Sequence, residues 1–250
     1  MFCEKKLGGT TFFVFQELET IPNLVHAFTL RQSDSSINHV NPSVPDAKQD
    51  QALLEALGIR SGQLVFLEQV HSNQVVRLNP SPANDLEPAV IGSADGVLVQ
   101  SSDLFPVIRT ADCLPILAVA RQQMCLLHAG WRGTRDRIAA IGITRFLERP
   151  GVTPEDVTVV IGPCIRSCCY QVGPEVRAQF EEAGHDVEQL FRGDRLDLVR
   201  ANQEQIRELG VTKVLDSGMC TACRTDLFYS YRKEGETGRN WLLAGFRGEP

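Results

Sequence analysis

The sequence has 250 residues, of which 43% are hydrophobic and 22% charged, and it carries a formal net charge of −6. These values exclude a collagen, a coiled coil and a wholly disordered chain, and the acidic balance disfavours nonspecific binding to nucleic acid or to an anionic membrane. The longest apolar run, 114–120, is far shorter than the roughly 20 residues of a spanning helix, so we expect no transmembrane segment.

Short runs rich in apolar or β-branched residues predict strands, and segments with apolar residues at helical spacing predict helices. The strands are expected at 64–68, 74–78, 96–100, 114–120, 124–128, 157–161, 211–215 and 241–246. The helices are expected at 48–57, 132–147, 174–182 and 198–209. Pro174 and Gly210 occupy typical first-turn and post-helix positions. Polar stretches with prolines at 33–46 and 79–93 predict surface loops.

The order of these elements indicates the fold class. Predicted strands outnumber helices, and they often follow one another directly instead of alternating with helices. This order favours an α+β fold with substantial antiparallel sheet over a doubly wound α/β fold. The sequence contains no internal repeat and no clear domain linker, and its length is sufficient for a large core.

The N-terminus and the cysteine content favour a cytoplasmic protein. The apolar patch near the N-terminus spans only Phe12 to Phe15, whereas a secretory signal needs roughly 7–15 apolar residues. Eight cysteines in a chain of this length do not make a disulfide scaffold, which is typical of small secreted domains. We therefore expect reduced thiols.

Three short motifs place metal-type side chains at the ends of predicted strands. The motif Gln-Val-His-Ser-Asn contains His71, the motif Thr-Ala-Asp-Cys-Leu-Pro contains Cys113, and the motif His-Ala-Gly-Trp-Arg-Gly-Thr begins with His128. Strand ends held by a rigid sheet are common positions for binding and catalytic residues. These three residues, named here the His–Cys–His trio, are therefore the first candidates for a site.

Two imidazoles and one thiolate form a suitable donor set for zinc, and three protein ligands leave a fourth position open, as in catalytic sites. The sequence separations within the trio are wide and follow no spacing rule. A second interpretation therefore stays open, in which Cys113 is a small buried residue and the two histidines belong to the core or its rim.

The third motif also predicts an anion site. It marks the passage from a strand to a helix, and helix N-termini favour phosphate through free N–H groups and the helix dipole. Arg132, Arg135 and Arg137 add positive charge, and Arg132 is the best candidate for binding phosphate. A solvated helix face is the alternative, because Asp136 and Glu148 lie among these arginines.

Other cysteines are candidates for a second metal site: Cys164, Cys168, Cys169, Cys220 and Cys223. Structural zinc sites usually draw on two close pairs, whereas the first three of these form a Cys-x-x-x-Cys-Cys group. The Cys-x-x-Cys pair lacks the thioredoxin-like context of a redox motif. We therefore interpret these residues as buried or incidental thiols, and we expect Cys125, inside a predicted strand, in the core.

Seven motifs together resemble those of one family, the bacterial laccase-domain proteins, formerly called multicopper polyphenol oxidases and now regarded as zinc-dependent purine nucleoside phosphorylases. They follow the family order from about residue 60 to 240, so the resemblance covers most of the chain, and the set is specific although each motif alone is weak. The motifs are Gln69-Val70-His71, Ala94-Asp95-Gly96, Thr110-Ala111-Asp112-Cys113-Leu114-Pro115, His128-Ala129-Gly130-Trp131-Arg132-Gly133, Ile161-Gly162-Pro163-Cys164-Ile165, Tyr170-Gln171-Val172-Gly173, and Phe228-Tyr229-Ser230-Tyr231-Arg232 with Thr237-Gly238-Arg239.

The resemblance implies that the trio binds zinc and forms the catalytic centre. It implies a single α+β domain, residues 1–250, with paired mixed sheets flanked by helices in α/β/β/α layers, similar to cysteine–histidine toxin deamidases. It also implies phosphorolysis of adenosine, inosine, guanosine and methylthioadenosine, together with deamination of adenosine. Purine nucleosides and phosphate would then be the partners, with Arg132, Arg232 and Asp112 near the substrate or phosphate.

Two departures from the family pattern concern the substrate contacts and not the trio. Lys233 stands where the family often has a second Arg, and Gln171 stands where Glu is frequent. The proton-transfer residue stays open, because Asp112 and Glu68 are the carboxylates nearest to the motifs in sequence. The preferred purine and the oligomeric state also stay open.

The donor set suits the implied chemistry. Zinc lowers the pKa of a bound water to about 7, and zinc deaminases use such a water at C6 of adenine. For phosphorolysis, zinc and Arg132 would orient phosphate toward the anomeric carbon of the ribose.

Three alternatives remain. Cys113 as nucleophile with His128 as base would make a metal-free Cys–His hydrolase. Five histidines are too few for a multicopper oxidase, yet one copper ion bound adventitiously at the trio would give weak polyphenol oxidase (laccase-like) activity. A module that only binds nucleosides or another protein comes last, because it would not need three reactive side chains.

Overall fold

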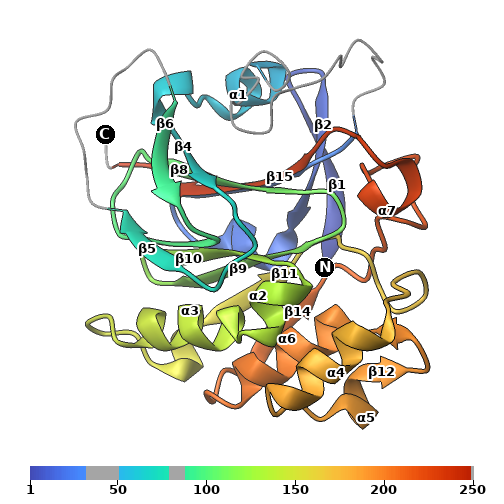
Figure 1. Ribbon diagram of the computed structural model, residues 1–250. Coiled ribbons are helices and arrows are strands. Elements are labelled where there is room, and N and C mark those ends of the chain that lie inside the picture. Colours follow the sequence, from blue (N-terminus) through green and yellow to red (C-terminus); the bar gives the residue numbers. More distant parts are fainter. Residues whose placement is uncertain (32–50, 79–87, 249–250) are drawn as a thin grey trace.

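Two stacked β-sheets form the centre of the molecule (Figure 1). The computed structural model describes residues 1–31, 51–78 and 88–248. Each sheet contains both parallel and antiparallel strand pairs. The α+β class expected from adjacent apolar runs is therefore confirmed.

The first sheet has seven strands in the order β1-β2-β3-β15-β8-β4-β6. These are β1 (Phe2–Leu7), β2 (Thr10–Phe15), β3 (Leu24–Thr29), β4 (Leu64–Glu68), β6 (Ala89–Ser93), β8 (Phe105–Thr110) and β15 (Asn240–Phe246). The last strand of the chain, β15, lies between β3 and β8, so the C-terminal segment joins the N-terminal strands to the rest of the sheet.

The second sheet has six strands in the order β14-β11-β9-β10-β7-β5. These are β5 (Val75–Leu78), β7 (Gly96–Val99), β9 (Leu114–Ala120), β10 (Gln123–Ala129), β11 (Thr158–Ile161) and β14 (Lys213–Asp216), and a separate ribbon pairs β12 (Phe191–Arg192) with β13 (Arg195–Leu196). Every residue of β9 is buried, and so is every residue of β10 after the first. The start of β9 and the end of β10 lie together, because Leu114 pairs with Ala129.

Helices cover the outer faces of both sheets (Figure 1). They are α1 (Gln51–Leu57), α2 (Trp131–Arg135), α3 (Ile138–Leu147), α4 (Pro174–Glu182), α5 (Val187–Leu190), α6 (Leu198–Arg207) and α7 (Tyr231–Glu234), with 3-10 turns at Gln16–Thr20, Ser61–Gln63 and Pro154–Asp156. Within the described ranges, no helix is both long enough and apolar enough to span a bilayer.

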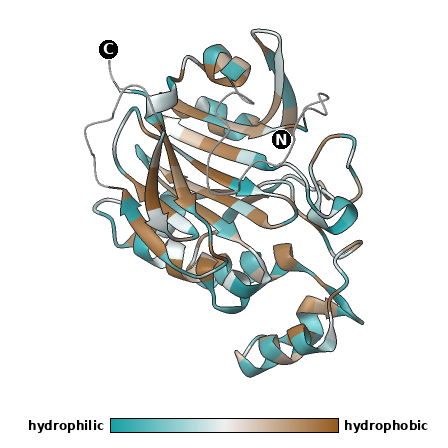
Figure 2. Cartoon of the chain, turned by 45° about the horizontal axis from the view of Figure 1, so that its top comes forward, coloured by the Kyte–Doolittle hydropathy of each residue, from teal (hydrophilic) through white to brown (hydrophobic). Residues whose placement is uncertain are grey.

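Three buried clusters hold the layers together. One lies between the two sheets, one joins α1 to the first sheet, and one joins α3 and α6 to the second sheet. Successive side chains of β10 alternate between two of them: Leu126 belongs to the cluster between the sheets and Leu127 to the cluster under the helices. Strands buried on both faces explain the continuous apolar runs, and Figure 2 shows these strands mainly hydrophobic. The α/β/β/α layering is therefore confirmed.

All eight predicted strands are present, although several boundaries shift by one or two residues. Five longer strands and one short ribbon were not expected: β1, β2, β3, β6, β8 and the pair β12–β13. The edge strand β1 escapes detection because four of its residues are exposed, and β8 because Pro106 interrupts its apolar run.

The expected loop at 79–93 is wrong at its end, because Ala89–Ser93 forms β6, an exposed edge strand that pairs with β4 in parallel. The residues 79–87 of that loop lie outside the described residues, as do the loop at 33–46 and the residues 48–50 of the first expected helix.

The expected helix at 132–147 is wrong in its continuity. Arg137 has a left-handed backbone, with φ of 62°, and divides this segment into α2 and α3. Buried amides of α6 bind Thr134 at the break: Asn202 donates to its hydroxyl and Gln205 to its carbonyl. These tertiary hydrogen bonds replace helical ones, so they offset the cost of the break.

The buried His26 of β3 predicts a pH-dependent stability. Its Nε2 accepts a hydrogen bond of 2.9 Å from the Phe15 N–H, and burial lowers the pKa of His26 to about 4, with smaller opposed effects from Glu19 and Lys5. The unfolded chain takes up a proton below about pH 6.5, whereas the folded protein does so only near pH 4. We expect the free energy of unfolding to fall by about 3 kcal/mol between pH 7 and 4 through this residue.

Urea unfolding of the wild type and His26→Gln at several pH values measures this contribution. Gln keeps an acceptor for Phe15 but does not titrate, so the difference in stability between the two proteins should shrink as the pH falls. A difference that stays constant from pH 7 to 4 would contradict the prediction.

Candidate functional site

The structure brings the His–Cys–His trio together at one end of the second sheet. Cys113 precedes β9, His128 lies near the end of β10, and His71 lies in the loop between β4 and β5. One ligand atom from each lies within 4.8 Å of the others, and the two imidazole rings are 5.0 Å apart between centroids. The side chains are therefore placed to share one small cation, and their role as ligands stays a prediction.

The loop that carries His71 is fixed by hydrogen bonds to two neighbours. The side chain of Gln69 donates to the Arg109 carbonyl and accepts from the Arg109 N–H, both at 2.8 Å. His71 itself has a left-handed backbone, with φ of 59°. A non-glycine residue keeps such a conformation only where its surroundings hold it.

The side chain of Asp95 holds both histidines. Its carboxylate accepts hydrogen bonds from the backbone N–H groups of Val70, His71 and Ser72, and from the Ser72 hydroxyl. The same carboxylate lies 2.7 Å from Nδ1 of His128. This contact fixes the imidazole tautomer and leaves Nε2 of His128 for a metal or a proton.

The electrostatics of the site favour a charged Cys113–His128 pair. Burial alone would raise the pKa of the Cys113 thiol, but the charge of His128 and hydrogen bonds from His128 and His71 lower it to about 6. Burial would lower the pKa of His128, but Cys113 and Asp95 raise it to about 9. The thiolate form is the form that binds a metal or acts as a nucleophile.

Gly130 makes room for the trio. A Cβ atom at this position would lie 3.1 Å from Sγ of Cys113 and 3.1 Å from Cδ2 of His71. Gly133 has the same role three residues later, since its Cβ would lie 2.8 Å from the Ser72 carbonyl. The two glycines of the motif therefore allow α2 to pack closely on the loop of His71.

Asp112 lies next to the trio but faces away into a hydrogen-bonded cluster. It is 7% exposed, and its carboxylate accepts from the hydroxyls of Thr221 and Ser230 and from the N–H of Arg232. Both oxygens are thus engaged, so the carboxylate positions Arg232. Glu68 is exposed and accepts from the Ser93 hydroxyl.

The arginines of the third motif separate into one exposed side chain and two ion-paired ones. Arg132 is exposed and stacks on Trp131, with its guanidinium carbon 4.3 Å from the ring centroid. Arg135 pairs with Asp136, and Arg137 pairs with Glu208. The helix that was expected to bind phosphate at its N-terminus is only the five-residue α2, so the helix dipole gives little support for an anion there.

Tyr170 and Asp95 are site residues that the sequence did not single out. Burial and the negative charges of Cys113 and Asp112 raise the pKa of the Tyr170 phenol, whereas Arg232 and Arg132 oppose this. The Arg232 guanidinium lies 5.2 Å from the Tyr170 ring centroid. Both residues fall in quoted motifs, but no residue type or spacing in those motifs indicates a role beside the trio.

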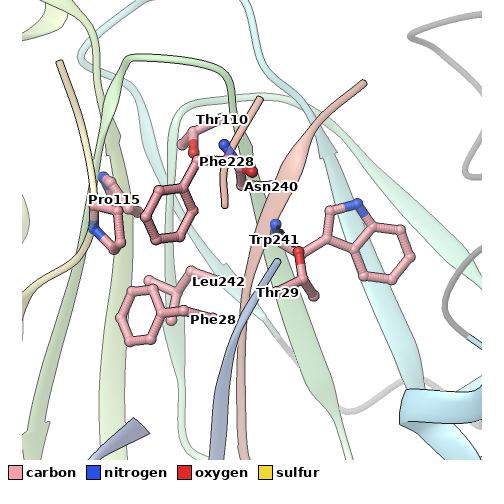
Figure 3. Close-up of a pocket in the computed structure, with 9 residues that line it drawn as sticks. Phe28, Thr29, Thr110, Pro115, Phe228, Asn240, Trp241 and Leu242 are labelled. Carbon is pink, nitrogen blue, oxygen red and sulfur yellow. Dashed lines mark hydrogen bonds between the residues drawn. The ribbon is translucent and has the colours of Figure 1, made fainter. Parts of the chain in front are cut away.

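A small pocket between the two sheets lies apart from this site (Figure 3). Its lining includes buried aromatic and polar residues, among them Phe28, Thr110, Phe228 and Asn240. No member of the trio lines this pocket. His71 of the trio is exposed, as are Arg132 and Arg232.

Two of the remaining cysteines are core residues. Cys125 and Cys164 each have 0% exposure, and burial raises the pKa of both thiols. The expected core position of Cys125 is confirmed.

The family model described as multi-copper polyphenol oxidoreductase laccase matches residues 32–247. The chain belongs to this family. A member from Deinococcus radiodurans, named purine nucleoside phosphorylase, is 34% identical over 240 residues, which cover 90% of each chain. The purine nucleoside phosphorylase YlmD of Geobacillus stearothermophilus is 34% identical over 79% of this chain and 77% of the relative.

Solved structures of the family share the whole fold. The crystal structure of YlmD from Geobacillus stearothermophilus superposes with a TM-score of 0.83 at 27% identity, and 99% of each chain is covered. The structure of the Bacillus licheniformis hypothetical protein YfiH superposes with a TM-score of 0.81 at 25% identity, over 94% of this chain and 96% of that one. The resemblance inferred from the seven motifs is therefore confirmed at the level of family and fold.

The position of Asp95 predicts a loss of metal affinity in Asp95→Asn. The amide replaces an acceptor that His128 and the loop of His71 both need, and loss of such a supporting contact typically costs about 10–100-fold in affinity. We expect a decrease of this size for zinc, measured by competition with a chromophoric chelator.

The matched control is Asp156→Asn, which removes an exposed ion pair with Arg121. It should leave zinc affinity unchanged. Equal affinities of Asp95→Asn and the wild type would contradict a supporting role for Asp95.

Proposed function

We propose that this protein is a zinc-dependent purine nucleoside phosphorylase that acts on adenosine, inosine, guanosine and methylthioadenosine and also deaminates adenosine. The proposal rests chiefly on the His–Cys–His trio, whose three ligand atoms lie within 4.8 Å of one another. It is supported by relatives in the same family that carry the name purine nucleoside phosphorylase.

The donor set fits zinc. Two imidazole nitrogens and one sulfur are ligands that zinc accepts in a tetrahedron, with the fourth position left for water or substrate. Asp95 orients His128 through Nδ1, and the lowered pKa of Cys113 provides the thiolate. Bound there, zinc would supply a Lewis acid and lower the pKa of a bound water to about 7.

The exposed arginines would bind the second substrate. Phosphorolysis joins a phosphate oxygen to C1′ of the ribose and breaks the bond from C1′ to the purine N9. The products are ribose 1-phosphate and the neutral purine base, which takes up the proton that the phosphate loses. Arg232 lies 5.2 Å from the Tyr170 ring, and Arg132 helps to lower the pKa of the same phenol. Both arginines carry planar guanidinium groups suited to phosphate. Asp112 holds the Arg232 N–H at 2.7 Å, and the Gln171 carbonyl accepts from Arg232 Nη1 at 2.6 Å.

A copper oxidase function receives less support from the same residues. In the portion of the chain that the structure describes, the groups able to hold a metal are the trio and a set of four cysteines. His26 bonds to Phe15 and His185 lies 2.7 Å from the Arg135 carbonyl, so neither joins the trio. We propose that copper at the trio would be adventitious, because copper exceeds zinc in affinity for such ligands.

The contacts from Asp95 to His128 and from His128 to Cys113 support a second candidate function. A base oriented by a carboxylate and bonded to a thiolate is the arrangement of a Cys–His hydrolase. This function needs Cys113 and His128 but gives no role to His71, whereas the zinc enzyme needs all three. The two functions can therefore be separated by one substitution.

Chromatography of the products formed from adenosine tests the main proposal. Zinc-loaded, copper-free protein should release adenine only when phosphate is present, and inosine with or without phosphate. His128→Ala and His71→Ala should each lower both activities by about 100-fold or more, because each removes a zinc ligand. His185→Ala, a histidine outside the trio, is the matched control and should keep full activity.

Two results would overturn the zinc proposal. Absence of turnover by the zinc-loaded protein is one. Turnover that survives both His71→Ala and complete removal of metal by a chelator is the other, and it would favour the Cys–His hydrolase.

The two arginines predict a separation of the activities. Arg132→Lys and Arg232→Lys keep a positive charge but lose planar two-point contact, so each should raise the KM for phosphate by about 10-fold. Deamination without phosphate should change little. Arg239→Lys, an exposed arginine that bonds to its own loop, is the control. An unchanged KM for phosphate in both variants would contradict their role.

A further inference from the structure

Four cysteines outside the trio converge on one point, and we name them the cysteine cluster: Cys168, Cys169, Cys220 and Cys223. Their sulfur atoms all lie within 4.8 Å of one another. Sγ of Cys223 lies 3.6 Å from Sγ of Cys168 and 3.3 Å from Sγ of Cys169. Zinc–sulfur bonds of about 2.3 Å in a tetrahedron place sulfurs about 3.8 Å apart, so the cluster already has nearly the dimensions of a four-thiolate zinc site.

Backbone hydrogen bonds hold the two segments of the cluster together. The two segments that carry the cluster are joined by a bridge between Cys164 and Cys220, with the Thr221 N–H donating to the Cys164 carbonyl at 3.0 Å. In the second segment, the N–H groups of Cys223 and Arg224 both donate to the Cys220 carbonyl and close a tight turn. In the first segment, the N–H groups of Cys169 and Tyr170 donate to the Arg166 carbonyl.

A cation lies beside the cysteine cluster. The guanidinium group of Arg195 donates to the Cys168 carbonyl. Four thiolates around one divalent cation leave a net charge of −2, which the nearby guanidinium group partly offsets.

We propose that the cysteine cluster binds one structural zinc ion, separate from the His–Cys–His trio. Four protein sulfurs fill a tetrahedral shell and leave no open position, which is the arrangement of structural and not of catalytic zinc. Binding displaces the protons of the thiols that are still protonated and forms four zinc–sulfur bonds, with no change of oxidation state.

This zinc ion would hold two segments that lie beside the trio. Thr221, between two of the ligands, donates to Asp112, and Gln171, two residues after Cys169, accepts from Arg232. The zinc would thus tie together the turns that position Asp112 and Arg232. It would affect the reaction only indirectly, through the positions of Asp112 and Arg232.

The sequence interpretation of these residues as buried or incidental thiols rested on a Cys-x-x-x-Cys-Cys group that included Cys164. Cys164 has 0% exposure and packs in the core under α3 and α6. Without Cys164, the ligands form two close pairs: the adjacent Cys168 and Cys169, and the Cys-x-x-Cys pair, whose spacing is typical of structural zinc sites.

Zinc content and X-ray absorption test the proposal. The double variant His71→Ala/Cys113→Ser, which lacks the trio, should keep about one zinc per chain, with four sulfur neighbours at about 2.3 Å. Adding Cys223→Ser to that variant should remove the remaining zinc and lower the thermal midpoint of unfolding. Adding Cys3→Ser, a cysteine of β1 outside both groups, is the matched control and should remove none.

Four other results would each overturn the proposal. Two concern the metal content of the trio variant: no zinc, or iron in place of zinc. The other two are nitrogen or oxygen neighbours in the absorption spectrum of that variant, and a disulfide in protein purified without oxygen. If Cys223→Ser fails to fold, the absorption spectrum of the trio variant still decides. A wild type with a single zinc in a four-sulfur shell would refute zinc at the trio and support the cluster, so the two metal proposals are tested separately.

Discussion

The carboxylate of Asp95 has no exposed surface, and five hydrogen bonds converge on it from the loop of His71 and from His128. Burial would raise the pKa of this carboxyl, but the hydrogen bonds from His128 and Ser72 outweigh burial and hold it below its ordinary value. An ionised carboxylate in the interior is stable only with such complete pairing. The pairing fixes a left-handed loop and an imidazole tautomer at once, so the geometry of the trio depends on it.

The sheets supply the rest of that geometry. Cys113 and His128 lie at the same end of the β9–β10 pair because antiparallel register brings Leu114 opposite Ala129. Both strands are buried on two faces, so their ends move little relative to one another. His71 comes from the first sheet's side of the molecule, where Gln69 ties its loop to the end of β8. The site is thus assembled where the two sheets meet.

The features of the fold and of the site that depend on local sequence pattern can be predicted from the sequence. Long apolar runs such as β9 are recognisable because both of their faces are buried, and the trio is recognisable because reactive side chains follow such runs. The division between α2 and α3 is not visible locally, because Asn202 and Gln205 stabilise it from α6. Asp95 is hidden for the same reason, since its five donors come from residues that are 23 to 33 positions away. The cysteine cluster joins segments more than 50 residues apart in the sequence. The backbone bridge between Cys164 and Cys220 brings these segments together, and no local pattern predicts it.

The two candidate metal-binding groups differ in the number of ligands that they offer. The trio offers only three ligands, so a bound cation would keep a position for substrate. The cysteine cluster offers four sulfurs, which are enough to fill a tetrahedral zinc shell. Asp112 lies between them: it precedes Cys113 in the chain and accepts from Thr221 of the cluster's second turn. Asp112 therefore links the second turn of the cluster to Arg232, and Gln171, two residues after Cys169, contacts the same arginine.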